Sequence, residues 1–218
     1  MIETWIADIR YLKNRDCFEK HYSSLPKWRK EKADQLKTPL KKAQSVGAWI
    51  LWQEIQRKYQ SEESEVLGTF NLSHAGDYVM CSVDRSKQVG IQIGCDIEKV
   101  KPVNLSVAKR FFCPAEYDRI MAEDTRDKKT ETFYRFWVLK ESFVKATKKG
   151  FRIDPRSFEI VLTTPPTLLR QPKEFTSKYY YQEYEWNEIP YKMAVCATTP
   201  IIAQEINREF IDVLKTIC

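Results

Sequence analysis

Apolar and polar positions along the chain follow two spacings, which predict a mixture of strands and helices. Strand-like runs occupy 2–9, 69–73, 78–83, 89–98, 157–163, 177–186 and 191–198. Helical spacing predicts a basic helix from about 26 to 37, a core helix over 40–59, short helices at 105–111 and 115–122, and a long helix over 128–149. Residues 203–216 carry apolar side chains on one side and predict a C-terminal amphipathic helix, with Ile206, Phe210, Val213, Leu214 and Ile217 as those side chains.

The order of these elements predicts an α+β fold made of two similar halves. Strand, helix and strands come first, and helices and strands follow. We place the boundary so that 1–102 form the N-terminal half and 103–218 form a C-terminal half that ends in a helix. The halves share no clear residue-level repeat and no long linker separates them. One compact body is therefore expected.

The composition narrows the class of protein. Of the 218 residues, 43% are hydrophobic and 30% are charged, which is typical of a soluble globular chain. No apolar run approaches the roughly 18–20 residues needed to span a bilayer, and the N-terminus lacks the layout of a signal peptide. The six cysteines are scattered without a C-x-x-C pair, so reduced thiols and a cytoplasmic location are expected.

The net charge of +6 is unevenly distributed. Residues 10–42 carry a local charge of +7 and residues 140–156 a local charge of +4, so the rest of the chain is acidic. Two basic segments on an acidic body predict one focused anionic ligand. The alternative is that both segments are solvated helix faces.

The strand at 89–98 carries a pair of carboxylates. Val89, Ile91, Ile93, Cys95 and Ile97 alternate as its expected buried face. Asp96 and Glu98 then share the opposite face, about 7 Å apart by strand geometry. Two adjacent carboxylates repel each other, and a hard cation such as Mg²⁺ would take both as oxygen ligands. The alternative is a strand whose outer face is simply hydrated.

The long helix carries a charged stripe. Trp137, Glu141 and Lys145 follow each other at intervals of four residues, with Lys140 beside them. This pattern fits ordinary surface pairing, or a third metal carboxylate with lysines that hold the phosphates of a metal-bound ligand. Ser73 and His74 end an earlier strand and place polar groups at a loop. They are not a catalytic dyad, because adjacent strand residues point to opposite faces.

Together these segments resemble the 4′-phosphopantetheinyl transferases of the surfactin-synthetase-activating (Sfp) type. The resemblance runs from about 26 to 197 and rests on four motifs: Asn71-Leu72-Ser73-His74-Ala75-Gly76, Gly94-Cys95-Asp96-Ile97-Glu98, Arg110-Phe111-Phe112 with Glu116-Tyr117, and the stretch from Trp137 to Lys145. It implies a pseudo-twofold α+β enzyme with coenzyme A and Mg²⁺ between its halves. Such an enzyme moves the phosphopantetheine arm of coenzyme A onto a serine of a carrier protein and releases 3′,5′-adenosine bisphosphate.

The resemblance also assigns roles to individual residues. It implies metal ligands at Asp96, Glu98 and Glu141. It implies coenzyme A contacts at Arg29, Lys32, Ser73, His74, Lys140 and Lys145. Glu141 is the preferred general base and Glu116 the reserve, and Lys145 is counted with these two as catalytic.

Two departures from the family pattern affect coenzyme A binding. The arginine that the family places before its first core helix is missing, and Lys41-Lys42-Ala43-Gln44 stands there. The Gly-Lys-Pro segment that precedes the Ser-His motif is also missing, because 65–69 is too short to contain it. Other residues are expected to hold the coenzyme.

The expected partners are an apo acyl or peptidyl carrier protein and coenzyme A, with a monomeric enzyme and no nucleic acid or membrane. Carrier proteins are typically acidic, so the basic segments are expected to steer them, with Phe111 and Phe112 as apolar anchors. One alternative is a nucleic-acid-binding module, because basic helices with aromatic residues such as Trp28 can follow a phosphate backbone. The other is a coenzyme A-binding scaffold without catalysis.

Overall fold

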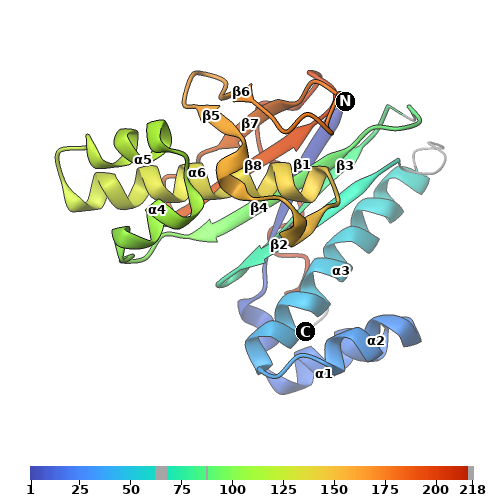
Figure 1. Ribbon diagram of the computed structural model, residues 1–218. Coiled ribbons are helices and arrows are strands. Elements are labelled where there is room, and N and C mark those ends of the chain that lie inside the picture. The colour runs from blue at the N-terminus through green and yellow to red at the C-terminus, as the bar shows by residue number, and fades with distance from the viewer. Residues whose placement is uncertain (62–67, 87, 216–218) are drawn as a thin grey trace.

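The computed structural model describes residues 1–61, 68–86 and 88–215 and contains two antiparallel three-stranded sheets (Figure 1). The first sheet has the order β1 (Ile2–Asp8), β3 (Tyr78–Asp84), β2 (Phe70–Ala75). The second has the order β4 (Ile93–Lys99), β8 (Tyr191–Ala197), β7 (Tyr180–Tyr184). One long helix accompanies each sheet: α3 (Pro39–Ser61) the first and α6 (Arg126–Ala146) the second. The predicted α+β class is confirmed.

The alternation of side chains along the strands sorts the core into layers. In β3, Val79, Cys81 and Val83 pack toward α3, whereas Met80 faces the second sheet. In β8, alternate residues likewise divide between the cluster under α6 and the cluster between the sheets. Each sheet therefore has a helix on one face and the other sheet on its opposite face, and the helix-on-sheet arrangement occurs once in each half.

Shorter elements surround this core. In the first half these are the 3₁₀ turn η1 (Arg10–Lys13), α1 (Arg15–Ser23) and α2 (Lys27–Asp34). In the second half they are α4 (Ala108–Phe111), α5 (Pro114–Met121) and the hairpin of β5 (Glu159–Val161) with β6 (Thr167–Arg170), besides the 3₁₀ turns Leu105–Val107, Gly150–Arg152 and Pro155–Ser157. The sequence pattern missed α1, although Asn14 caps it by accepting hydrogen bonds from the amides of Asp16 and Cys17.

One predicted boundary is wrong. The strand expected over 89–98 begins at Ile93, because Val89 and Gly90 form a turn in which Val89 is fully exposed rather than buried. The core helix begins at Pro39, one residue before the predicted start, since a proline lacks the amide hydrogen that the first helical turn leaves unpaired anyway. Residues 62–67, which include most of the 65–69 segment, lie outside the described part of the chain.

The predicted C-terminal helix is also wrong over the described residues. Residues 201–215, the C-terminal strap, run along the free edge of β1 instead. The Ala203 amide donates to the carbonyl of Ile2 (2.8 Å) and the Asn207 amide to that of Thr4 (2.7 Å). Phe210, Val213 and Leu214 join the core beneath α3, whereas Ile206 packs against the core between the sheets. The pattern that predicted a helix is therefore satisfied by packing along β1. The tail of the second half thus packs on the first, and Ile217 lies outside the described residues.

Most cysteines in the described ranges carry free thiols. Cys81, Cys95, Cys113 and Cys196 are free, whereas Cys17 is disulfide-bonded, so the expectation of reduced thiols is wrong at Cys17. No helix within the described ranges has the length and apolar character needed to cross a bilayer.

Candidate active site

The helix α6 lies directly against β4 at Gly94. A Cβ at this position would overlap the carbonyl oxygen of Ser142 and the amide nitrogen of Ala146, both in the α6 backbone. Only glycine lets the helix approach this closely. Because side chains alternate along β4, the residues that share Gly94's face are Asp96 and Glu98. The close approach therefore sets them against α6.

Two side chains of β2 join the sheets where β2 and β4 meet. The amide of Cys95 donates to Asn71 Oδ1 (3.0 Å), and the amide of Ile97 donates to Ser73 Oγ (3.4 Å). These bonds replace the backbone ladder that the two strands lack. Sequence reasoning missed this role of Asn71, although its spacing of two residues from Ser73 on a strand was the available signal.

Lys145 is the hub of the site. Its Nζ lies 2.7 Å from Asp96 Oδ1, 2.8 Å from Ser73 Oγ and 2.9 Å from the carbonyl oxygen of Cys95. Ser73 Oγ also donates to Asp96 Oδ1 (2.9 Å). Loss of hydration on burial is the largest influence on the pKa of Lys145 and lowers it, but Asp96, Cys95 and Glu141 together raise it by more, so the net shift is upward. α6, β2 and β4 are thus tied together at one ammonium group.

The carboxylates around this hub are electrostatically unbalanced. Asp96 Oδ2 is buried and has no hydrogen-bond partner among the described residues. Burial and the neighbouring Asp96 raise the pKa of Glu98 to about 7, and the same two causes raise the pKa of Glu141. An unpaired buried oxygen beside two carboxylates that resist ionisation fits a divalent cation with oxygen ligands. In the described residues no three His, Cys, Asp or Glu side chains already stand close enough to hold a metal, so the carboxylates would have to converge on it.

His74 connects the carboxylates to the basic N-terminal helices. Its side chain is exposed at the end of β2. Partial loss of hydration lowers the pKa of His74, and the positive charges of Lys145 and Lys32 lower it further. Beside it, Gln44 donates through Nε2 to the carbonyl of Gly76 (3.0 Å) in the β2–β3 turn, where Gly76 has φ +51°. Gln44, from the segment that lacks the family's arginine, therefore braces this turn.

Arg29 is a buried cation with incomplete bonding. The residue is 6% exposed, and Nη2 donates to the carbonyl oxygen of Ser45 (2.8 Å). Its Nε has no partner, and no carboxylate in the described ranges lies within ion-pair distance. Burial lowers the pKa of Arg29. A buried guanidinium without a counter-charge is suited to an external anion.

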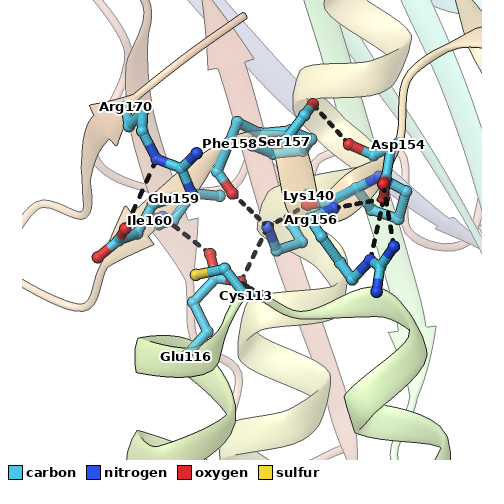
Figure 2. A network of polar contacts seen from close by, with 11 residues as sticks. Cys113, Glu116, Lys140, Asp154, Arg156, Ser157, Phe158, Glu159, Ile160 and Arg170 are labelled. Atoms are coloured by element: carbon cyan, nitrogen blue, oxygen red, sulfur yellow. Dashed lines mark hydrogen bonds and ion pairs between the residues drawn. The ribbon is translucent and has the colours of Figure 1, made fainter.

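Lys140 and Glu116 form a separate network on another side of α6. Figure 2 shows Lys140 pointing between α5 and the 155–160 segment. Its Nζ lies 2.9 Å from Glu116 Oε2 and donates to the carbonyls of Pro155 (2.6 Å) and Phe158 (2.9 Å). Glu116 accepts from the amides of Cys113 (3.0 Å) and Ile160 (2.8 Å).

Both members of this network are sealed, with side chains only 4% and 1% exposed. The structure therefore brings together Asp96, Glu98, Glu141, Lys145, Ser73 and His74, with Arg29 and Lys32 on the adjoining helix. It does not bring Lys140 or Glu116 into polar contact with any of them.

Several known proteins are similar to this chain in sequence. The profile described as "4'-phosphopantetheinyl transferase superfamily" matches residues 92–197. The chain is 35% identical over 177 residues to 4'-phosphopantetheinyl transferase Sfp of Bacillus subtilis (strain 168), which covers 74% of this chain and 76% of that protein. It is 39% identical over 131 residues to another 4'-phosphopantetheinyl transferase of Bacillus subtilis, covering 60% of this chain and 55% of that protein. 4'-Phosphopantetheinyl transferase HetI of Nostoc sp. is 34% identical over 128 residues, covering 54% of this chain and 52% of that protein.

A solved structure, that of Thermotoga maritima holo-[acyl-carrier-protein] synthase (AcpS), is 18% identical and covers 49% of this chain and 61% of that one, with a TM-score of 0.42. The sequence matches make the chain a transferase. It belongs to the 4′-phosphopantetheinyl transferase superfamily, and its relatives place it with the Sfp type.

Proposed function

We propose that this enzyme transfers the 4′-phosphopantetheine arm of coenzyme A to a serine of an apo carrier protein. The products are the holo carrier protein and 3′,5′-adenosine bisphosphate. The structural observation that carries the proposal is the unpaired Oδ2 of Asp96 beside Glu98 and Glu141. Family membership gives this arrangement its substrate class.

The carboxylates divide between metal binding and proton transfer. Asp96, Glu98 and Glu141 would hold Mg²⁺, which when bound would neutralise charge on the pyrophosphate of coenzyme A. Glu141 is also our choice for the base that accepts the serine proton, because its pKa is raised by burial and by Asp96. Glu116 is a poorer candidate, since its carboxylate already accepts two backbone hydrogen bonds and pairs with Lys140 in the core.

The cations divide in a similar way. Lys145 fixes Asp96 and adds positive charge where the pyrophosphate would lie. Arg29, Lys32 and His74 would hold the 3′-phosphate, a role that the unpaired Nε of Arg29 supports. The ammonium group of Lys140 already pairs with Glu116 and donates to two backbone carbonyls, so we do not include Lys140 in the phosphate site.

The carrier protein would approach beside α4. Phe112 is buried in the core, whereas Phe111 is half-buried and packs edge-on against Trp137 (5.0 Å between ring centroids). Phe111 is therefore the apolar anchor that we assign to carrier docking. Charge steering predicts that the KM for the carrier rises with ionic strength more than the KM for coenzyme A.

Intact-mass spectrometry tests the reaction. Several apo carrier proteins are incubated with enzyme, coenzyme A and Mg²⁺, and one carrier should gain a single phosphopantetheine. Asp96→Asn should abolish the gain, whereas Asp127→Asn, an exposed acid at the start of α6, should not. Absence of the gain with every carrier, or full activity in EDTA, would contradict the proposal. Salt-sensitive binding to random DNA without a need for Mg²⁺ would instead favour a nucleic-acid-binding module.

A second measurement tests the 3′-phosphate site. Alanine at Arg29, Lys32 or His74 should weaken coenzyme A far more than 3′-dephospho-coenzyme A, by roughly ten- to a hundredfold per lost charge-assisted contact. Lys20→Ala, at an exposed position in α1, is the control. Equal losses for the two ligands would remove these residues from the 3′-phosphate site.

A further inference from the structure

Trp28 is an unusually exposed aromatic residue with a rigid support. It lies in α2 with 54% of its surface exposed. Its ring packs edge-on against Trp49 of α3, with 4.9 Å between centroids and an interplanar angle of 80°. The edge contact fixes the ring while most of its surface stays in solvent. Such a ring is a ready surface for a planar ligand group.

The guanidinium of Arg29, which has no carboxylate partner among the described residues, lies next to this ring. The guanidinium carbon lies 5.4 Å from the Trp28 centroid and 4.7 Å from the Trp49 centroid. Arg29 has an unpaired Nε, and no carboxylate among the described residues lies within ion-pair distance of its guanidinium. This group is therefore suited to binding an anion. A planar surface and an anion-binding group side by side match a ligand that carries both a ring and a phosphate.

The orientation of α2 points this cluster toward the carboxylate site. Trp28 and Lys32 are four residues apart, so they share one face of the helix. Lys32 is close enough to His74 to lower its pKa, and so is Lys145, which is paired with Asp96. His74 therefore lies within electrostatic range of Lys32 on α2 and of Lys145 beside Asp96. A ligand that spans these groups would place its ring at α2 and its other charged groups near the carboxylates.

We propose that Trp28 stacks on the adenine base of coenzyme A and selects for the nucleotide. This inference rests on the proposed function and adds a base-binding residue to it. The chain also lacks the Gly-Lys-Pro segment of the family pattern, so other residues are expected to hold the coenzyme. The base lies on the exposed Trp28 ring, and the adjoining phosphate lies against Arg29 and Lys32.

The test compares a ligand that has the base with one that lacks it. Dissociation constants of adenosine 3′,5′-bisphosphate and of inorganic pyrophosphate are measured by calorimetry for the wild type, Trp28→Ala and Trp28→Phe. Loss of one base–aromatic stack should weaken the nucleotide roughly 5- to 100-fold in Trp28→Ala and leave pyrophosphate unchanged. Trp28→Phe should restore most of the affinity, but the nucleotide-induced change in tryptophan fluorescence should be lost.

Trp186→Ala is the matched control. Trp186 also stands beside an arginine, Arg208, whose guanidinium carbon lies 5.4 Å from its ring, but it belongs to the second half. It should leave both ligands unaffected. Unchanged nucleotide affinity in Trp28→Ala overturns the inference, as does an equal loss for both ligands. A rise in carrier KM alone would assign Trp28 to carrier docking and also overturn it. If the wild type bound neither ligand and transferred nothing, the proposed function itself would fail.

Discussion

Two lysine–carboxylate pairs lie on the same helix, and they differ in how completely they are satisfied. Lys140 with Glu116 is closed: the ammonium has three oxygen partners, and both carboxylate oxygens are engaged. Lys145 with Asp96 is open, because Asp96 Oδ2 has no partner among the described residues and the Lys145 side chain remains 28% exposed. The closed pair stabilises the fold, whereas the open pair leaves a carboxylate oxygen that can bind a cation.

Helix geometry explains how one helix carries both pairs. Five residues separate the two lysines, which at 3.6 residues per turn places them about 140° apart around the axis. The Lys140 side faces the cluster that includes Phe158 and Ile160, whereas the Lys145 side faces β4 at Gly94. A buried charge pair is costly unless every polar atom is satisfied. An unsatisfied pair retained beside two further carboxylates therefore indicates a ligand site.

Cutting the closed pair should have the largest effect on stability. Glu116→Ala leaves a buried ammonium and two backbone amides without their acceptor, so we expect a loss of about 3–5 kcal/mol in the free energy of unfolding. Urea titration measures it. The double variant Lys140→Met with Glu116→Gln should recover part of the loss, because no buried charge then remains.

Transfer assays on that double variant decide between the two roles of Glu116. A folded protein with near-normal kcat supports the structural role. If Glu116→Ala left the stability unchanged and greatly lowered kcat, Glu116 would be the catalytic base, and the closed pair would not be a purely structural one.

The second-largest effect is expected from a substitution that separates α6 from β4 and so moves the two members of the open pair apart. Gly94→Ala forces the α6 backbone away, because the atoms it would meet are backbone atoms that cannot rotate aside. Overpacking of this kind costs typically 1–3 kcal/mol. We also expect the Mg²⁺-dependent rise in Tm to disappear, since Glu141 and Lys145 move with the helix. A thermal scan with and without Mg²⁺ measures both effects, and an unaltered Tm response would contradict the packing argument.

Sequence patterns predicted α6, β4 and the carboxylates at the open pair, because each of these residues lies in a helix or strand with a regular spacing of apolar positions. They did not separate Lys140 from Lys145, since spacing gives angles around a helix but not which side meets the core. Only the packed 155–160 segment shows that Lys140 is enclosed. The C-terminal strap was missed for a related reason: its apolar positions fit a helix, but the unpaired edge of β1 offered its backbone stronger partners.

Neutralising a carboxylate of the open site should stabilise the metal-free enzyme. The pKa of Glu98 is raised to about 7 by burial and by Asp96, so its ionised form is unfavourable at neutral pH. Glu98→Gln should therefore raise the free energy of unfolding in EDTA by about 1–2 kcal/mol, after allowance for partial exposure. The stabilisation by added Mg²⁺ should be reduced. Glu131→Gln, an exposed acid on α6, is the control, and a destabilised Glu98→Gln would show that this carboxylate already has its cation.

The smallest expected effect compares two buried serines, one whose side chain bonds to the open pair and one whose side chain does not. Ser73 Oγ accepts from Lys145 and from the Ile97 amide, whereas Ser142 Oγ donates only to the Leu139 carbonyl within α6. Ser73→Ala should cost about 1 kcal/mol and Ser142→Ala less, because the Leu139 carbonyl keeps its place in the helix. Since Ser73 also helps to orient Asp96, its removal should weaken Mg²⁺ binding a few-fold while Ser142→Ala does not. Paired urea and Mg²⁺ titrations of the two variants measure the difference. Equal effects would mean that the open pair keeps its shape without Ser73, and that its readiness to bind comes from Lys145 and Gly94 alone.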